Sequence, residues 1–256
     1  MNKNAKSIKL AIVTPTHKSS LSLLEINRLT ITLQQNKQTE HYFLVPKSLQ
    51  LLNLKENFPS SKFITYEDNF FESKMAFNSL MLTPIFYESL IQYEYLLMSE
   101  LDSLVVKNIE PILINNFTYL GAAWNPSAYL TEHFGKLYRR RIKLPFGKIH
   151  ELQSGNGGLS LRNTNDIYEI LVLALKSKFF EREINYFRNI NWDVLTVFML
   201  KKFGIPPVSK AIANKFFIET TKRELYNYDE IYGFHALQRY DSTLETKIIE
   251  SFKLDL

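Results

Sequence analysis

The chain has 256 residues, of which 45% are hydrophobic and 22% are charged, close to the average for globular proteins. This composition excludes collagen and coiled coil and argues against disorder. No apolar run approaches the ~18 residues needed to cross a bilayer, so we expect no membrane span. Because cysteine is absent, the chain has no disulfide, no thiolate nucleophile, no iron–sulfur cluster and no cysteine-ligated zinc.

Basic residues outnumber acidic residues by 31 to 26, which gives a net charge of +5. Such an excess suits a phosphorylated ligand or an anionic membrane surface. The densest basic cluster is Arg139–Arg141, with Lys136, Lys143 and Lys148 around it. A solvated loop is the ordinary interpretation of this cluster. Because it is not the extended basic stripe of a dedicated nucleic-acid binder, we expect no nucleic-acid partner.

The chain contains no internal repeat, no low-complexity tract and no linker, so we predict one domain over 1–256. Its first residues are basic, but the apolar run that follows is too short for a secretory signal and predicts a first strand. Without a signal and without cysteine, a cytoplasmic location is expected. The basic segment at about 125–153 could then contact the inner face of a membrane.

Strand and helix signals alternate through the first hundred residues. Ser22 and Glu25 make a capping box that opens a helix, and Thr83-Pro84 opens another that runs to about Gln92. Apolar runs predict strands at 9–13, 41–45, 62–66 and 95–98. This alternation indicates an α/β domain with a mixed, mainly parallel central sheet flanked by helices. Ligands of such sheets collect at the carboxyl ends of the strands.

The second half of the chain is less regular. Between Trp124 and Gln153 no period prevails and Pro and Gly recur, so we predict a loop-rich segment. Asn163 can cap a helix rich in Ile and Leu, and a second helix runs from about Asp193 to Phe203.

The triplet Glu100-Leu101-Asp102 directly follows the predicted strand at 95–98. Side chains at i and i+2 of an extended segment point the same way, so both carboxylates can face one hard cation. Mg²⁺ or Mn²⁺ held in this way would neutralise a diphosphate leaving group. The alternative is a pair of solvated acids at a strand end, a common pattern.

The segment Ser154–Arg162, with sequence SGNGGLSLR, holds three of the eight glycines of the chain. Such density permits positive φ angles and close approach of the backbone to a ligand. A tight turn into a strand is the alternative, because Asn156-Gly157 is also a hairpin signal. The segment has neither the Walker pattern nor the dinucleotide-binding pattern of glycines.

Two further residues are candidates for chemistry. Asp193 stands at the start of a predicted helix, where it could serve as a general base or, more ordinarily, as a helix cap. His235 follows Gly233-Phe234, and its imidazole could complete a metal site or simply be a structural residue in the core.

These signals occur together in an order that resembles a largely uncharacterised glycosyltransferase family of GT-A type. The shared elements include a strand that ends in a single Asp, a Gly-Ala-x-Trp segment, a Gly-Asn-Gly-Gly-x-Ser-Leu-Arg motif, an acidic motif and a late Gly-Phe-His. In this chain they are Asp102, Gly121–Trp124, Gly155–Arg162, Trp192-Asp193 and Gly233–His235. The resemblance runs from about Leu10 to Leu237, and it implies a single GT-A (Rossmann-like) domain.

The resemblance also implies roles for individual residues. Asp102 would hold a Mn²⁺ or Mg²⁺ ion and the diphosphate, with His235 as a further ligand and Glu100 as a third, although Glu departs from the family pattern at that position. Asp193 falls where inverting enzymes place their base, while Trp192 occupies a position where an acid often stands. The residues expected to contact the nucleotide sugar are Thr14, Thr16, Asn156, Gly157, Gly158 and Arg162.

We therefore expect metal-assisted transfer of a sugar from a nucleotide diphosphate sugar to a hydroxyl of a glycan or lipid-linked acceptor, with inversion favoured. Such an enzyme would act in the synthesis of surface glycans or glycolipids. Two other classes of protein stay open from the residues alone. A non-catalytic module for nucleotide sugars or glycans would keep the fold and the glycine motif without turnover. An interaction protein would use the basic segment on an anionic surface, with a steep salt dependence.

Overall fold

The computed structural model describes residues 9–133, 136–138, 143, 145–177, 190–219 and 230–254. Its centre is a six-stranded sheet with the order β3-β2-β1-β4-β10-β6, in which β1 to β4 pair in parallel with one another and β10 is antiparallel to both β4 and β6. The strands are β1 (Leu10–Pro15), β2 (Glu40–Pro46), β3 (Lys62–Tyr66), β4 (Tyr95–Ser99), β6 (Tyr119–Gly121) and β10 (Leu159–Asn163). The predicted mixed, mainly parallel sheet is confirmed.

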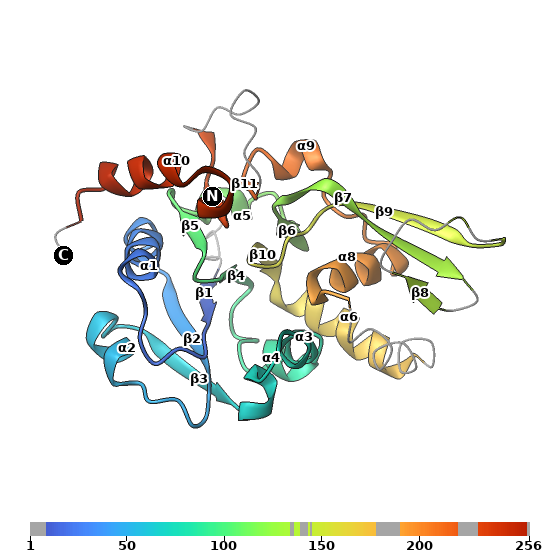
Figure 1. Cartoon of the computed structure of the whole chain (residues 1–256). Helices are drawn as coiled ribbons and strands as arrows, with labels where there is room; N and C mark the ends of the chain where they lie inside the picture. The colour runs from blue at the N-terminus through green and yellow to red at the C-terminus, as the bar shows by residue number, and fades with distance from the viewer. Residues whose placement is uncertain are drawn as a thin grey trace, which may run out of the picture.

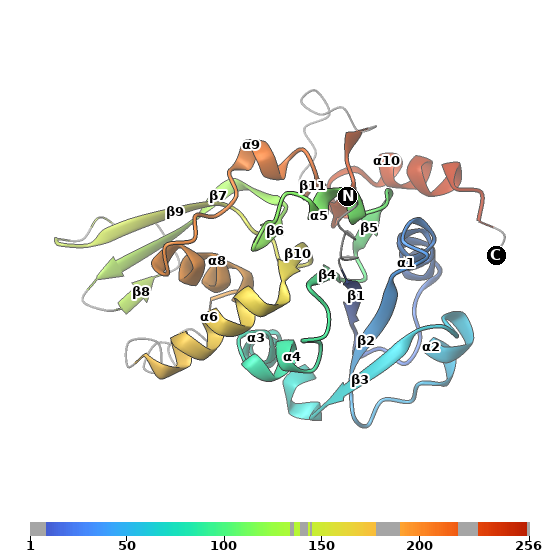
Figure 2. The same ribbon diagram turned by 180° about the vertical axis from the view of Figure 1, so that it is seen from behind.

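Helices cover both faces of this sheet (Figures 1 and 2). The helices are α1 (Leu23–Gln35), α2 (Leu52–Asn57), α3 (Lys74–Met81), α4 (Pro84–Glu88), α6 (Thr164–Lys176) and α8 (Trp192–Lys202). Successive residues of β2 enter opposite cores, because Tyr42 belongs to the core with α3, α4, α6 and α8 while Phe43 belongs to the core with α1 and α2. A short 3₁₀ helix, η1 (Asp68–Phe71), precedes α3.

A second sheet of three strands has the order β11-β12-β5. Its strands are β5 (Ser103–Val105), β11 (Phe217–Ile218) and β12 (Gly233–His235). Because β12 is antiparallel to β5, His235 lies opposite Ser103. The adjoining helices are α5 (Glu110–Leu113), α9 (Lys210–Ala213) and α10 (Leu237–Ser251), and α10 is kinked at Asp241.

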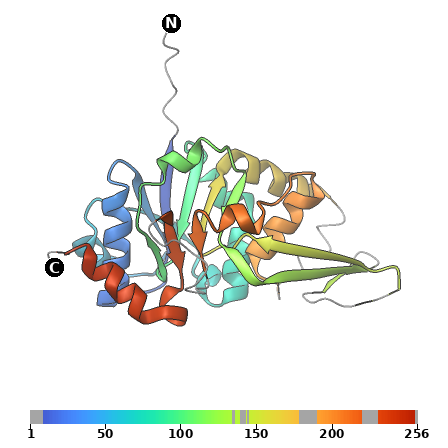
Figure 3. The same ribbon diagram turned by 90° about the horizontal axis from the view of Figure 1, so that it is seen from above.

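A third sheet forms an arm that extends away from the body of the molecule (Figures 1 and 3). Its order is β8-β7-β9, all antiparallel, with β7 (Ala123–His133), β8 (Lys136–Tyr138) and β9 (Lys148–Ser154). The expectation of a loop-rich segment was wrong here. The pairing of β7 with β9 is irregular between Ala123 and Ala128, a stretch that contains Pro126, and this irregularity hides the period of two. Arg139–Arg141 lie outside the described residues.

Several predicted helix ends are present. The Ser22–Glu25 capping box forms, the Asn163 side chain accepts a bond from Asp166 N, and α8 ends before Gly204, whose φ is +82°. The helix predicted to reach Gln92 ends earlier, at Glu88. In the part of the chain that the structure describes, no helix is both long enough and apolar enough to cross a membrane.

Candidate functional site

Strand pairing brings the distant motifs to one edge of the central sheet. Parallel pairing places the carboxyl ends of β1 and β4 side by side, with Val13 opposite Met98, so Thr14 lies level with Ser99. Antiparallel pairing of Leu159 with Ser99 sets the glycine loop, residues 155–158, beside Glu100. The Glu100 amide then donates to the Gly158 carbonyl over 2.8 Å. The second sheet adds His235 opposite Ser103.

Three side chains at this edge converge. One potential ligand atom from each of Glu100, Asp102 and His235 lies within 4.8 Å of the others. His235 Nε2 is 3.2 Å from Asp102 Oδ1 and 3.8 Å from Glu100 Oε2. The Glu100 and Asp102 side chains remain 35% and 28% exposed, so they are accessible from solvent. We call these three residues the acidic cluster.

His235 is buried, and neither of its ring nitrogens makes a hydrogen bond of normal geometry to any described residue. Burial alone would lower the pKa of its imidazole, but the carboxylates of Asp102, Glu100 and Glu219 raise that pKa well above its ordinary value. Burial likewise opposes ionisation of Asp102, yet His235 and Arg239 hold its pKa below the ordinary value.

The donor set fits a divalent cation. Two carboxylates and an imidazole with no hydrogen bond to the described residues offer the oxygen and nitrogen ligands that Mn²⁺ and Mg²⁺ sites use, and phosphate oxygens commonly complete such sites. A buried imidazole that makes no such bond is costly unless a proton or a ligand compensates it.

The three glycines of the loop pack too closely for a side chain at their positions. A Cβ added at Gly158 would lie 2.1 Å from His235 Nε2, and one added at Gly157 would lie 2.2 Å from the Trp192 ring. Gly155 has φ +126°. The turn leads into β10, but Asn156-Gly157 makes no hairpin, because β9 and β10 belong to different sheets. The Asn156 side chain closes the loop by accepting from Gly158 N.

Asp193 lies beside Gly157, whereas His235 and Glu100 of the acidic cluster lie beside Gly158. Its Oδ2 accepts from Gly157 N over 3.1 Å and its Oδ1 from Val194 N over 2.8 Å. Burial, together with the smaller effect of the Glu100 charge, raises the pKa of Asp193 to about 6, against the effect of the two amide bonds. The carboxylate therefore joins the first turn of α8 to the glycine loop.

Arg162 has a different place from the one we expected. Its side chain is fully buried beneath the loop, where Nη2 donates to the Gly157 carbonyl and Nη1 to Tyr87 Oη, each over 3.1 Å. The guanidinium carbon lies 4.1 Å from the centroid of the Trp192 ring. On β10 its side chain points into the core that α8 covers. It supports the loop and is not exposed toward a ligand.

Thr14 and Thr16 are expected in the loop after the first strand, but Thr14 lies within β1, Thr16 directly follows it, and both are buried. The Thr14 hydroxyl is bonded to His41 Nε2 over 3.0 Å, and Thr16 Oγ1 accepts from Lys18 N. Burial lowers the pKa of His41 to about 3, so this imidazole is neutral.

Two charged residues at the site were not predicted. Glu219 Oε1 lies 3.7 Å from His235 Nδ1, and Arg239 Nη2 lies 3.1 Å from Asp102 Oδ2. Glu219 directly follows the buried strand β11. An acid after an apolar strand is the same sequence signal that pointed to Glu100, so this signal could have found Glu219. Arg239 carries no comparable signal.

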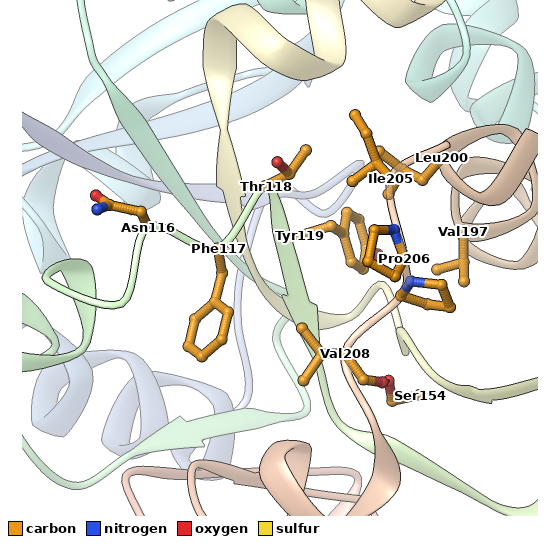
Figure 4. Close-up of a pocket in the computed structure, with 11 residues that line it drawn as sticks. Asn116, Phe117, Thr118, Tyr119, Ser154, Val197, Leu200, Ile205, Pro206 and Val208 are labelled. Carbon is orange, nitrogen blue, oxygen red and sulfur yellow. The ribbon is translucent and has the colours of Figure 1, made fainter. Parts of the chain in front are cut away.

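A cavity of about 200 Å³ lies between the segment 116–119, helix α8 and the segment 205–208 (Figure 4). Its walls are mainly apolar, and none of the predicted site residues lines it. Two wall residues reach the glycine loop, since Tyr119 Oη donates to the Gly155 carbonyl and the Val197 side chain packs against Gly155. The lining residues are Asn116, Phe117, Thr118, Tyr119, Ser154, Val197, Leu200, Ile205, Pro206, Pro207 and Val208.

Solved structures with the same arrangement of elements include glycosyltransferases. The apo form of mouse xyloside xylosyltransferase 1 matches with a TM-score of 0.55 and 11% identity, over 89% of this chain and 97% of that one. The galactosyltransferase LgtC, in complex with donor and acceptor sugar analogues, matches with a TM-score of 0.53 and 13% identity, over 94% of this chain and 95% of that one. The chain therefore has the GT-A fold.

The chain belongs to the family described as "Protein of unknown function (DUF5672)", whose model matches residues 60–235. The matched region contains the acidic cluster, the glycine loop and Asp193. No curated protein matches the sequence.

The pKa of Asp193 predicts a pH dependence of stability. Because its pKa in the folded protein, about 6, exceeds the ordinary 3.8, this group contributes most to stability below pH 4 and loses that contribution as pH rises through 6. The loss amounts to about 3 kcal/mol. Asp193→Asn should lack this pH-dependent loss. Between pH 4 and 7 the unfolding free energy of the variant should therefore rise relative to that of the wild type.

The measurement is urea denaturation in metal-free buffer at half-unit steps of pH. Subtracting the two curves cancels the other titrating groups and leaves the contribution of Asp193. A difference that stays constant across the range would contradict the raised pKa and would leave Asp193 as an ordinary helix-terminal acid.

Proposed function

We propose that this protein transfers a sugar from a nucleotide diphosphate sugar to a hydroxyl of a glycan or lipid-linked acceptor. The observation that carries the proposal is the convergence of the buried His235 imidazole with two accessible carboxylates, since one potential ligand atom from each of the three residues lies within 4.8 Å of the others. These groups stand at the carboxyl edge of the sheet in a GT-A fold, where α/β sheets bind their ligands.

In this proposal Glu100, Asp102 and His235 hold Mn²⁺ or Mg²⁺. A bound cation of this kind neutralises the negative charge that develops on a diphosphate leaving group. Glu219 faces the other ring nitrogen of His235 and orients the imidazole, as carboxylates commonly do behind metal-binding histidines. Arg239, 71% exposed beside Asp102, adds a cation on the solvent side of the cluster.

The donor sugar would lie against the glycine loop, next to the acidic cluster. Asn156, Gly157 and Gly158 present backbone there without side chains that would exclude a ligand, as the close contacts of both glycines require. Thr14 and Thr16 would border the nucleotide from the end of β1. Arg162 contributes indirectly, because it holds the Gly157 carbonyl from below.

Asp193 would act as the general base. Its carboxylate takes the proton of the acceptor hydroxyl, the hydroxyl oxygen forms a bond to the anomeric carbon, and the bond from that carbon to the diphosphate breaks with its electron pair on the diphosphate. A pKa of about 6 leaves the carboxylate ionised yet still basic near neutral pH. A single displacement of this kind inverts the anomeric centre.

Metal-dependent nucleotide binding tests the acidic cluster. Thermal unfolding with a panel of nucleoside diphosphates and nucleotide sugars, each with and without Mn²⁺, should reveal a ligand that raises the Tm only with the metal. At a hundredfold excess over Kd the gain is about 2.7 kcal/mol, which is about 5–10 °C for a domain of this size. Asp102→Asn should abolish this shift, while Glu67→Gln, in an exposed ion pair elsewhere, should keep it.

The outcomes separate the classes of function. A full Mn²⁺-dependent shift in Asp102→Asn would contradict the metal role of Asp102. A shift in the wild type without sugar transfer or donor hydrolysis would favour a non-catalytic nucleotide-sugar module.

Turnover tests the role of Asp193. Asp193→Asn should lower kcat by about 10²- to 10⁴-fold, the usual contribution of a general base, with donor affinity within a few-fold of wild type. Proton NMR of the first product formed should show the anomer opposite to that of the donor. A product with the donor's anomeric configuration would contradict base-catalysed single displacement at Asp193.

We also propose that the arm formed by β7, β8 and β9 contacts an anionic membrane surface. Phe146 is 94% exposed near the start of β9, and Lys143 and Lys148 beside it in sequence are exposed. An exposed aromatic ring flanked by lysines is suited to the interface of an anionic bilayer. An enzyme with a lipid-linked acceptor would work at such a surface.

Sedimentation with vesicles tests this contact. The protein should bind vesicles that contain phosphatidylserine, and Phe146→Ala should weaken binding by about tenfold, since burial of a Phe side chain contributes about 1.5–3 kcal/mol. Ile114→Ala, at an exposed apolar residue outside the arm, should bind as the wild type does. Equal binding by Phe146→Ala, or binding to RNA in preference to vesicles, would contradict the membrane role.

A further inference from the structure

Helix α1 carries a buried polar stripe. Arg28, Thr32 and Asn36, the last at the C-terminal cap of the helix, are 3%, 0% and 3% exposed. Their spacing of four residues places them on one face of the helix. Buried polar groups of this kind need hydrogen-bond partners, because leaving them without any is costly.

Their partners lie at the same spacing along the segment that follows β4. Arg28 Nη1 donates to the Leu101 carbonyl over 3.3 Å. Thr32 Oγ1 accepts from Val105 N over 3.1 Å, and Asn36 Oδ1 accepts from Ile109 N over 3.0 Å. The stripe therefore holds the backbone of residues 101–109, and its first member reaches the turn that carries Glu100 and Asp102.

Arg28 also ties down helix α10. Its Nε and Nη2 make a two-pronged ion pair with Glu245, both bonds 2.9 Å, and Nη2 donates to Gln238 Oε1 over 3.2 Å. Glu245 is 2% exposed. Because α10 begins two residues after His235, a single guanidinium contacts both segments that carry the acidic cluster.

Each carbonyl of the turn accepts a hydrogen bond. Ser103 N donates to the Glu100 carbonyl and Ala236 N to the Asp102 carbonyl, both over 2.8 Å. The Leu101 carbonyl accepts from Arg28, the only side-chain donor to these carbonyls that the described residues show. The bond from Ala236 links the turn directly to the residue after His235. Ala236 itself has a left-handed backbone, with φ +53°.

We propose that Arg28 is a positioning residue for the metal site, which sets the distance of Glu100 and Asp102 from His235 through the Leu101 carbonyl and the docking of α10. The proposal rests on the metal-binding role given to the acidic cluster above. Partners behind metal ligands typically change metal affinity by about 10- to 100-fold when they are removed.

A purely structural ion pair would predict something different. Replacing both partners of a buried ion pair with apolar residues of similar volume is often neutral for stability. Arg28→Met/Glu245→Met should therefore keep the fold and the packing of α10 but leave the Leu101 carbonyl without its donor. The double variant separates positioning from stability, and it keeps the test valid if Arg28→Met alone, with Glu245 left buried and unpaired, fails to fold.

The experiment measures Mn²⁺ affinity by electron paramagnetic resonance and amide hydrogen exchange at Ala236. In Arg28→Met/Glu245→Met, Mn²⁺ should bind about 10- to 100-fold more weakly, and the Ala236 amide should exchange at least about tenfold faster, at unchanged global stability. Lys202→Met, which removes an ion pair with Glu132 on the arm, should change neither quantity.

If the double variant keeps both its Mn²⁺ affinity and its exchange rate at the Ala236 amide within twofold of the wild type, the positioning role of Arg28 is overturned. The docked helix α10 would then suffice to hold the site in place. If the wild type binds no Mn²⁺, the metal role of the acidic cluster fails. Exchange at Ala236 still decides whether Arg28 holds the two segments together, because that measurement needs no metal.

Discussion

The antiparallel pairing of β10 with β4 is the constraint on which the rest of the site depends. β4 runs parallel to β1 and ends in the turn that carries Glu100 and Asp102, while β10 starts where β4 ends. This single reversal places the glycine loop directly against that turn, with the Glu100 amide bonded to the Gly158 carbonyl. Glycine at position 158 follows from the same contact, because a side chain there would occupy the place of the His235 ring.

Two buried arginines stabilise the two halves of the site by different means. Arg162, under the glycine loop, lies against the rings of Trp192 and Tyr119 and donates to neutral oxygens. Arg28, under the turn that carries Glu100 and Asp102, pairs with the carboxylate of Glu245. A buried guanidinium is costly unless its donors are used, so each fixes several backbone and side-chain atoms at once. The fold thereby holds rigid elements behind a site whose front is open to solvent.

The charges of the site affect folding stability in opposite directions. The carboxylates of Glu100, Asp102 and Glu219 surround one buried histidine and raise its pKa, which favours the folded state, whereas Asp193 is ionised near neutral pH in a place that favours its protonated form. Like charges at this spacing repel each other unless a cation compensates them. Such arrangements are typical of functional sites, where groups are held in states that the fold alone would not select. A divalent cation would relieve this repulsion, and the proposed activity uses such a cation at the acidic cluster.

The sequence by itself determined the features that depend on neighbouring residues. It predicted the Ser22 capping box, the four leading strands, the glycine loop and the acid that ends β4, because caps, strand periods and glycine density act within a few residues. It missed the β7–β9 arm, since the irregular pairing around Pro126 breaks the period. Only the tertiary structure decided that Arg162 lies under the loop, that Glu219 joins the cluster, and that Arg28 meets Glu245, 217 residues away. Contacts over such distances depend on sheet order and helix docking, which no local pattern encodes.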